Sequence, residues 1–189
     1  MIAKINCASI LKAHFATLKR PGDGRRLCWA DIFLFYGVPA LIGTLVVWAL
    51  DRSIGREASN FLATVFSIFI GLLLNLLVII FDQVRTTGEQ LALLATSNAE
   101  DRTKDDDRKN LTLRLEILNE TFSNLSYSIL ISVVLLMLLF AERLFSGLIA
   151  VILSFAICFI IGNFLLTVLM VLKRVHALLT NEALRLRPK

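Results

Sequence analysis

Four long stretches without a charged residue constrain what this chain can fold into. They comprise residues 32–50, 58–81, 121–141 and 144–172. About 20 apolar residues cross a bilayer as a helix, whereas the strands of a membrane barrel are about half as long and alternate in polarity. Hydrophobic residues make up 57% of the chain, against roughly 45–50% in soluble domains. We therefore predict an all-α transmembrane bundle of four spans.

The uncharged stretches divide the chain into five parts. A basic leader (residues 1–30) precedes the first two spans (31–82), and a polar central segment (83–124) separates these from the third and fourth spans (125–172). A basic tail (173–189) follows, and we expect it to be helical. No short apolar region with a small-residue cleavage site precedes the first span, so we expect this span to remain in the mature protein.

One helical register runs from the second span through the central segment and into the third. A 4-3 spacing places side chains along one seam of a helix and requires a partner seam. We therefore expect these two spans to continue as an antiparallel helical hairpin, with Gly88 as a weak point where the first arm could break. The seam positions are Leu73, Leu77, Ile80, Val84, Thr87, Leu91 and Leu94 on the way out, and Leu111, Leu115, Leu118, Phe122, Leu125 and Ile129 on the way back.

The charges predict the orientation of the spans. Of the 20 Lys and Arg residues, 17 lie in the leader, the central segment and the tail, and 3 lie in the two short loops between the spans. By the positive-inside rule, both termini and the hairpin are expected in the cytoplasm. The leader and tail are basic, which suits anionic lipids, whereas the central segment carries a net negative charge.

The leader contains the pattern of an amphipathic helix. Cys7, Leu11, Phe15 and Leu18 form an apolar stripe, with lysines along its edge. We expect it either to lie in the membrane interface or to pack against the cytoplasmic face of the bundle. The candidate membrane-interface residues are Lys4, Lys12, Lys19, Arg20, Arg25, Arg26 and Trp29.

The turn between the two hairpin arms carries a cluster of acids. Its candidate partner-binding residues are Glu100, Asp101, Asp105, Asp106 and Asp107. Such a charged turn is either a solvated surface or an epitope for a protein with a basic face.

Small and amide residues lie inside two of the spans. Gly71 and Asn75 belong to the second span, and Gly162 and Asn163 belong to the fourth. Small residues let helices approach, and an amide in the membrane seeks a hydrogen-bonding partner. Both spans run in the same direction, which places the two amides at similar depth. These residues therefore either join helices, within or between subunits, or line a pore.

Groups for catalysis are scarce. The chain has two histidines, its spans carry no acid, and the nucleotide-binding, hydrolase and metalloprotease motifs are absent. We expect no enzyme activity, no cofactor, no metal and no direct contact with nucleic acid. Two functions remain: an oligomeric membrane scaffold or sensor that recruits a cytoplasmic effector through the hairpin, or an oligomeric pore-forming effector.

The layout resembles one known family. A basic leader, four spans, a helical cytoplasmic hairpin and the segment FIGLLLNLLVIIFDQV at residues 69–84 are similar to the KwaA family, the membrane subunits of the Kiwa anti-phage systems. The resemblance implies a homotetrameric sensor in the bacterial inner membrane. It also implies a cytoplasmic DNA-binding partner, KwaB, held on the inner face to block phage replication and transcription.

Overall fold

The computed structural model describes residues 7–17, 33–50, 54–96 and 102–185, and this part of the chain is helical without a strand. Helix α1 (Cys7–Thr17) is followed by a π-helical turn, η2 (Phe33–Gly37). The turn leads directly into α3 (Val38–Leu50). Three long helices complete the fold: α4 (Arg56–Thr96), α5 (Arg102–Glu142) and α6 (Leu148–Arg185).

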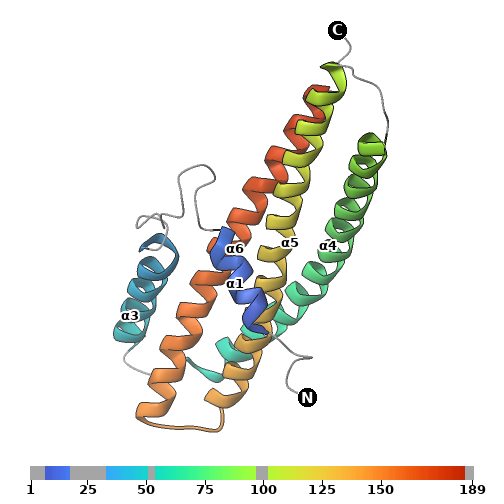
Figure 1. The fold of residues 1–189 in the computed structure, drawn as a ribbon. Helices are drawn as coiled ribbons and strands as arrows, with labels where there is room; N and C mark the ends of the chain where they lie inside the picture. Colours follow the sequence, from blue (N-terminus) through green and yellow to red (C-terminus); the bar gives the residue numbers. More distant parts are fainter. Residues whose placement is uncertain (1–6, 18–32, 51–53, 97–101, 186–189) are drawn as a thin grey trace.

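The helices form one layer with a short helix placed across it. Helix α6 packs between α3 and α5, and α5 packs between α6 and α4, so the order is α3, α6, α5, α4 (Figure 1). Helix α1 packs on α5 at the middle of this layer. Helices α3 and α4 are therefore the two edges of this layer.

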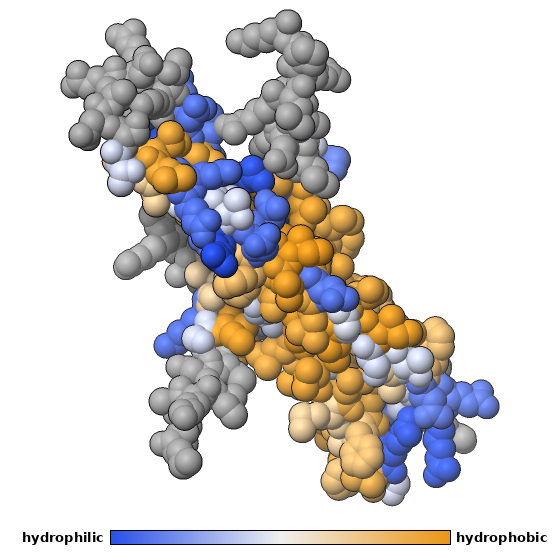
Figure 2. All heavy atoms as spheres, turned by 90° about the vertical axis from the view of Figure 1, so that its right-hand side faces the viewer, coloured by the Kyte–Doolittle hydropathy of each residue, from blue (hydrophilic) through white to orange (hydrophobic). Residues whose placement is uncertain are grey.

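The apolar helices are those of a membrane protein. Helices α4, α5 and α6 are each long and apolar enough to cross a bilayer, and the apolar helix at Phe33–Ala49 is shorter. This shorter helix contains Pro39, and its backbone changes from π to α geometry at Val38, next to the proline. In Figure 2 a broad orange belt of hydrophobic residues lies between two ends that carry hydrophilic residues.

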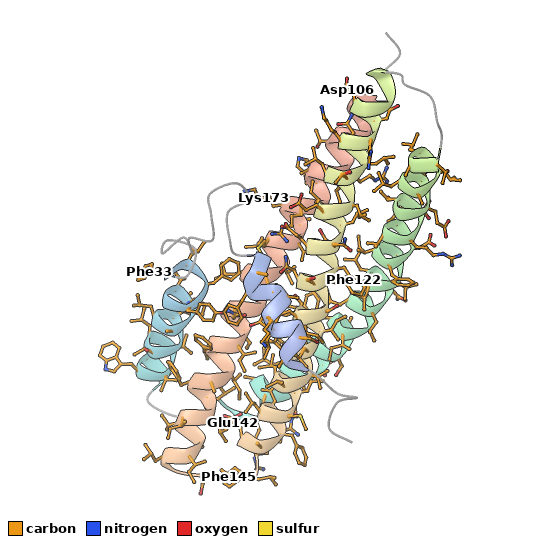
Figure 3. The ribbon with its side chains drawn as sticks, in the orientation of Figure 1. Phe33, Asp106, Phe122, Glu142, Phe145 and Lys173 are labelled. Carbon is orange, nitrogen blue, oxygen red and sulfur yellow. The ribbon has the colours of Figure 1, made fainter. Side chains whose placement is uncertain are left out.

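The three long helices extend well beyond their uncharged stretches. Helices α4 and α5 each have 41 residues and α6 has 38, which gives about 60 Å of helix at 1.5 Å per residue, against a hydrocarbon core of about 30 Å. Helix α4 runs unbroken through Gly88, and residues 173–185 continue α6 without interruption. We call the end near Asp106 the prolonged end and the end near Glu142 the loop end (Figure 3).

The core between the long helices repeats every seven residues. Such heptads give the left-handed packing of coiled coils. The positions expected from the 4-3 pattern are all buried or half-buried along α4 and α5. The fully buried rows are Ser59, Phe66, Leu73, Ile80 and Thr87 in α4; Leu118, Leu125, Ser132 and Leu139 in α5; and Ala150, Ile157, Phe164 and Val171 in α6.

A polar cluster closes the loop end. Ser154 donates a hydrogen bond to Glu142 Oε1 at 3.0 Å and accepts one from the backbone N–H of Ile54 at 3.1 Å. Glu142 is buried there, although it borders a short loop. The turn between α5 and α6 contains Gly147, whose φ of 67° lies in the left-handed region that glycine adopts without strain.

Candidate functional site

A buried polar network near the middle of the layer joins α1 to three other elements. His14 Nδ1 donates a hydrogen bond to Asn124 Oδ1 at 2.8 Å, and the His14 ring stacks on Tyr127 at a centroid distance of 3.8 Å. Tyr127 Oη in turn donates to Asn163 Oδ1 at 2.8 Å. Asn163 Nδ2 donates to the carbonyl oxygen of Phe35 at 3.1 Å. The network therefore connects α1, α5, α6 and η2.

Pro39 explains why Asn163 bonds a backbone carbonyl. In an α-helix the carbonyl of Phe35 would accept the N–H of residue 39, and proline has no N–H. The side chain of Asn163 supplies a donor to this carbonyl from the neighbouring helix. Gly162 lies beside it and lets α6 approach, because a Cβ on Gly162 would meet the Cβ of Pro39 at 2.9 Å.

The hydroxyl groups around the network are satisfied within their own helices. Thr121, Ser128, Ser132 and Thr167 are each buried, and each donates to the carbonyl four residues earlier. The interhelical bonds are therefore made by the amides, the phenol and the imidazole. These few side chains fix how α1 and η2 sit on α5 and α6.

Burial sets the protonation state of His14. Its side chain has no exposed surface. Loss of hydration lowers the pKa of His14 below its ordinary value, and the positive charge of Arg174 lowers it further, while the hydrogen bond to Asn124 opposes this shift. His14 is therefore neutral at pH 7 while α1 is docked.

The buried contact of α1 is made by His14 and not by the two described apolar residues of the predicted stripe. The predicted stripe includes Leu11 and Phe15, which remain 39% and 43% exposed, whereas His14 is 0% exposed. His14 lies three residues after Leu11, on the same side of the helix. The sequence therefore indicates on which side His14 lies, but it does not indicate which residues His14 contacts. The described part of the leader packs on α5, and its position relative to the membrane interface stays a prediction.

The candidate interface and partner residues are mostly outside the described side chains. Lys12 is exposed on α1, and Asp106 and Asp107 are exposed in the first turns of α5, at the prolonged end. Nothing is described for the side chains of the following candidates: Lys4, Lys19, Arg20, Arg25, Arg26, Trp29, Glu100, Asp101 and Asp105.

The four candidate residues inside the spans separate into two pairs. Gly162 and Asn163 lie at the contact between α6 and the η2–α3 segment. Gly71 and Asn75 are exposed on α4, and a Cβ on Gly71 would meet nothing within 4 Å. Since α5 lies between α4 and α6, the two amides do not come together within one copy of the chain.

Two side-chain contacts join the long helices beyond the network. Arg114 of α5 donates to Gln83 Oε1 of α4 at 3.1 Å. Arg174 of α6 forms an ion pair with Glu120 of α5 at 3.0 Å. The described residues contain no group of three metal-ligating side chains. The arrangement of the network is suited to holding helices in register.

Three comparisons found no matching family model, curated protein or solved structure.

Proposed function

We propose that this chain is a non-enzymatic membrane scaffold or sensor that oligomerises through its spans and recruits a cytoplasmic effector through the prolongation of α4 and α5. One observation carries the proposal: α4, α5 and α6 leave their apolar segments as unbroken helices. The contacts Arg114–Gln83 and Arg174–Glu120 join them there. A displacement of the spans is therefore transmitted to the prolonged end.

The proposed topology has four spans with both termini in the cytoplasm. The helix at Phe33–Ala49 serves as the first span, and its length of about 25 Å is supplemented by its flanking residues. The excess of Lys and Arg outside the two short loops orients the prolonged end and α1 towards the cytoplasm. The central segment, residues 83–124, then forms a cytoplasmic helical hairpin.

Helix α1 gives this scaffold a way to respond to the membrane. It is held on the bundle by His14, while Lys12 on its exposed face is available to anionic headgroups. Because His14 contacts Asn124 and Tyr127 of α5, a change in the position of α1 acts on the helix that leads to Asp106 and Asp107.

The resemblance to the KwaA family specifies a cellular role for the proposal. In that role the chain is a sensor in the bacterial inner membrane and its effector is KwaB. Phage plating on cells that express the chain with and without KwaB tests this role: protection that requires both proteins supports it, and protection by neither combination contradicts it.

The alternative function is an ion-conducting oligomer. The exposure of Asn75 on α4 favours it, because a lipid-facing amide in one copy can face a shared path in an assembly. This alternative predicts conductance from the purified chain in planar bilayers, altered by Asn75→Leu. Absence of conductance at any protein density would exclude it.

Affinity purification in mild detergent, with mass spectrometry and native mass, tests the scaffold. The variant carries Asp105, Asp106 and Asp107 changed to Lys, and the control carries Glu57→Lys at the start of α4, at the loop end. The scaffold predicts one soluble partner that the triple variant loses and the control keeps. A homo-oligomer without any soluble partner would contradict the recruitment.

A further inference from the structure

The side of α4 that faces away from the bundle carries a polar stripe along its whole length. All nine of its residues are exposed, and they lie opposite the buried row of Phe66, Leu73 and Ile80. Val78 is the only large apolar member. We call this set the outer stripe, and it comprises Asn60, Thr64, Ser67, Gly71, Asn75, Val78, Asp82, Arg85 and Glu89.

The two edges of the layer differ in the surface they offer to lipid. The outer face of α3 exposes Leu41, Leu45 and Trp48, which suits contact with acyl chains. Figure 2 looks onto the α4 edge, where pale and blue spheres cross the orange belt. Around the circumference of α4, exposed apolar residues lie on both sides of the outer stripe. The stripe is therefore a polar strip within the apolar segment and does not merely mark where that segment ends.

Most polar atoms of the outer stripe within the span are satisfied, but the amide of Asn75 is not. The hydroxyls of Thr64 and Ser67 donate to the carbonyls of Asn60 and Ala63 in their own helix. Asn75 makes no hydrogen bond in the part of the chain that the structure describes. It lies seven residues inside the first charged residue, Asp82, and so faces hydrocarbon, where an unpaired amide is costly.

We propose that the outer stripe is the contact surface for a second copy of this chain, with the two α4 helices parallel about a two-fold axis along the membrane normal. Copies inserted by the same charge rule share one orientation. A two-fold axis then places like residues together. Two Asn75 side chains can each donate to the carbonyl of the other, and Gly71 and Ser67 provide the small residues needed for close approach.

The charges where α4 leaves the span allow diagonal ion pairs under the same symmetry. Arg85 lies one turn after Asp82 on the same stripe; within one copy it forms an ion pair with Glu89 and is also attracted by the charge of Asp82. In a parallel pair about this axis the two Asp82 side chains lie next to each other, and Arg85 of each copy, one turn further on, lies diagonally across the axis from Asp82 of the other copy. Each aspartate is thus offered one cation by the other copy, which gives two such contacts, one on each side of the axis.

The inference rests on the proposed oligomeric scaffold and names its subunit contact. The chain supplies a matched set of variants for a test in liposomes, with association measured by energy transfer between labelled copies. Gly71→Leu fills the point of closest approach, although a Cβ at this position meets nothing within 4 Å in one copy. Gly88→Leu is the control: the same change on the same helix, at a site where a Cβ also meets nothing within 4 Å, but beyond Asp82 and therefore outside the span.

We expect Gly71→Leu to weaken association by at least about tenfold, which equals about 1.4 kcal/mol. Asn75→Leu is expected to weaken it about 3- to 30-fold, and Gly88→Leu to leave it unchanged. Equal association of all four proteins would overturn the proposed surface. Such a result would leave effector recruitment untouched, since that is read from the soluble partner in the affinity purification.

Disulfide cross-linking locates the contact independently. In a background with Cys7, Cys28 and Cys158 changed to Ala, single cysteines replace Ser67, Gly71, Asn75 and Val78, with Phe69 and Leu76 as controls on other sides of α4. Symmetric dimers should form at the four stripe positions and not at the controls. Cross-linking without this periodicity, or labelling of the stripe cysteines by a membrane-impermeant reagent, would overturn the second-copy contact.

Discussion

Asn163 Nδ2 lies 3.1 Å from the carbonyl oxygen of Phe35, the carbonyl that would bond residue 39 in an α-helix if that residue were not proline. A side chain of one apolar helix thus completes the backbone hydrogen bonding of another. The amide oxygen of Asn163 accepts a hydrogen bond from the hydroxyl of Tyr127. Asn163 is 3% exposed, so both bonds form out of contact with water.

Replacing Asn163 by leucine removes both bonds and leaves the Tyr127 hydroxyl buried without this acceptor. We expect Asn163→Leu to lower the free energy of unfolding by about 1–3 kcal/mol. Titration with dodecyl sulfate in mixed micelles, at dilutions where the chain is monomeric, measures this change. Asn75→Leu is the matched control, because its amide has no bond within the described chain, and it should change the unfolding free energy little. Equal effects of the two substitutions would contradict this assignment.

Gly162 is constrained by the same contact. A Cβ there would lie 2.9 Å from the Cβ of Pro39 and 3.2 Å from its Cα, so the helices must separate to admit it. We expect Gly162→Ala to destabilise the fold by about 1–3 kcal/mol, as overpacking does. In the same titration, Gly88→Ala should be neutral or stabilising by up to about 1 kcal/mol, since its Cβ enters open space and alanine favours helix.

His14 makes the docking of α1 dependent on pH. Its pKa is lowered in the docked state by burial, so the undocked helix binds more protons below the ordinary pKa of about 6.5. Docking is therefore unaffected by this group above pH 7.5. It weakens as the pH falls from about 6.5 towards the lowered pKa, by up to about tenfold per pH unit.

Amide hydrogen exchange of residues 7–17, corrected for the intrinsic pH dependence, measures the docking of α1. Exchange at pH 5.5 should exceed that at pH 7.5 in the native chain. In His14→Gln, which has no titrating ring, docking should be weaker at both pH values and equal between them. A pH dependence that persists in His14→Gln would assign the effect to another group.

The long helices and their buried rows are predictable from the sequence because the information is local. A 4-3 spacing identifies the side of a helix that is buried, and Leu73, Ile80, Leu118 and Leu125 are buried as this spacing indicates. The length of an uncharged stretch sets the extent of a span. For the first uncharged stretch the described residues show a shorter apolar helix, Phe33–Ala49, whose backbone changes from π to α geometry next to Pro39.

The candidate site was less predictable, because its contacts join residues far apart in the chain. His14 and Asn124 are separated by 110 positions, and nothing near either residue indicates the other. Asn75 and Asn163 have the same chemistry and similar depth in their spans. Only the order of helices in the layer places Asn163 in the interior and Asn75 on an edge.

The ion pair between Arg174 and Glu120 offers a test of whether the prolonged helices move as one unit. The two side chains are 17% and 32% exposed, and their 3.0 Å contact lies beyond the polar network, towards the prolonged end. We expect Glu120→Arg to destabilise the contact between α5 and α6 by about 1 kcal/mol, since partly exposed pairs contribute modestly. The double variant Glu120→Arg with Arg174→Glu should recover much of this loss.

Hydrogen exchange of the α5 amides between residues 106 and 120 should become faster in the single variant and return towards the native rate in the double variant. If the single variant leaves this exchange unchanged, the ion pair does not hold the prolonged helices together, and their continuity with the spans must depend on the apolar contacts alone.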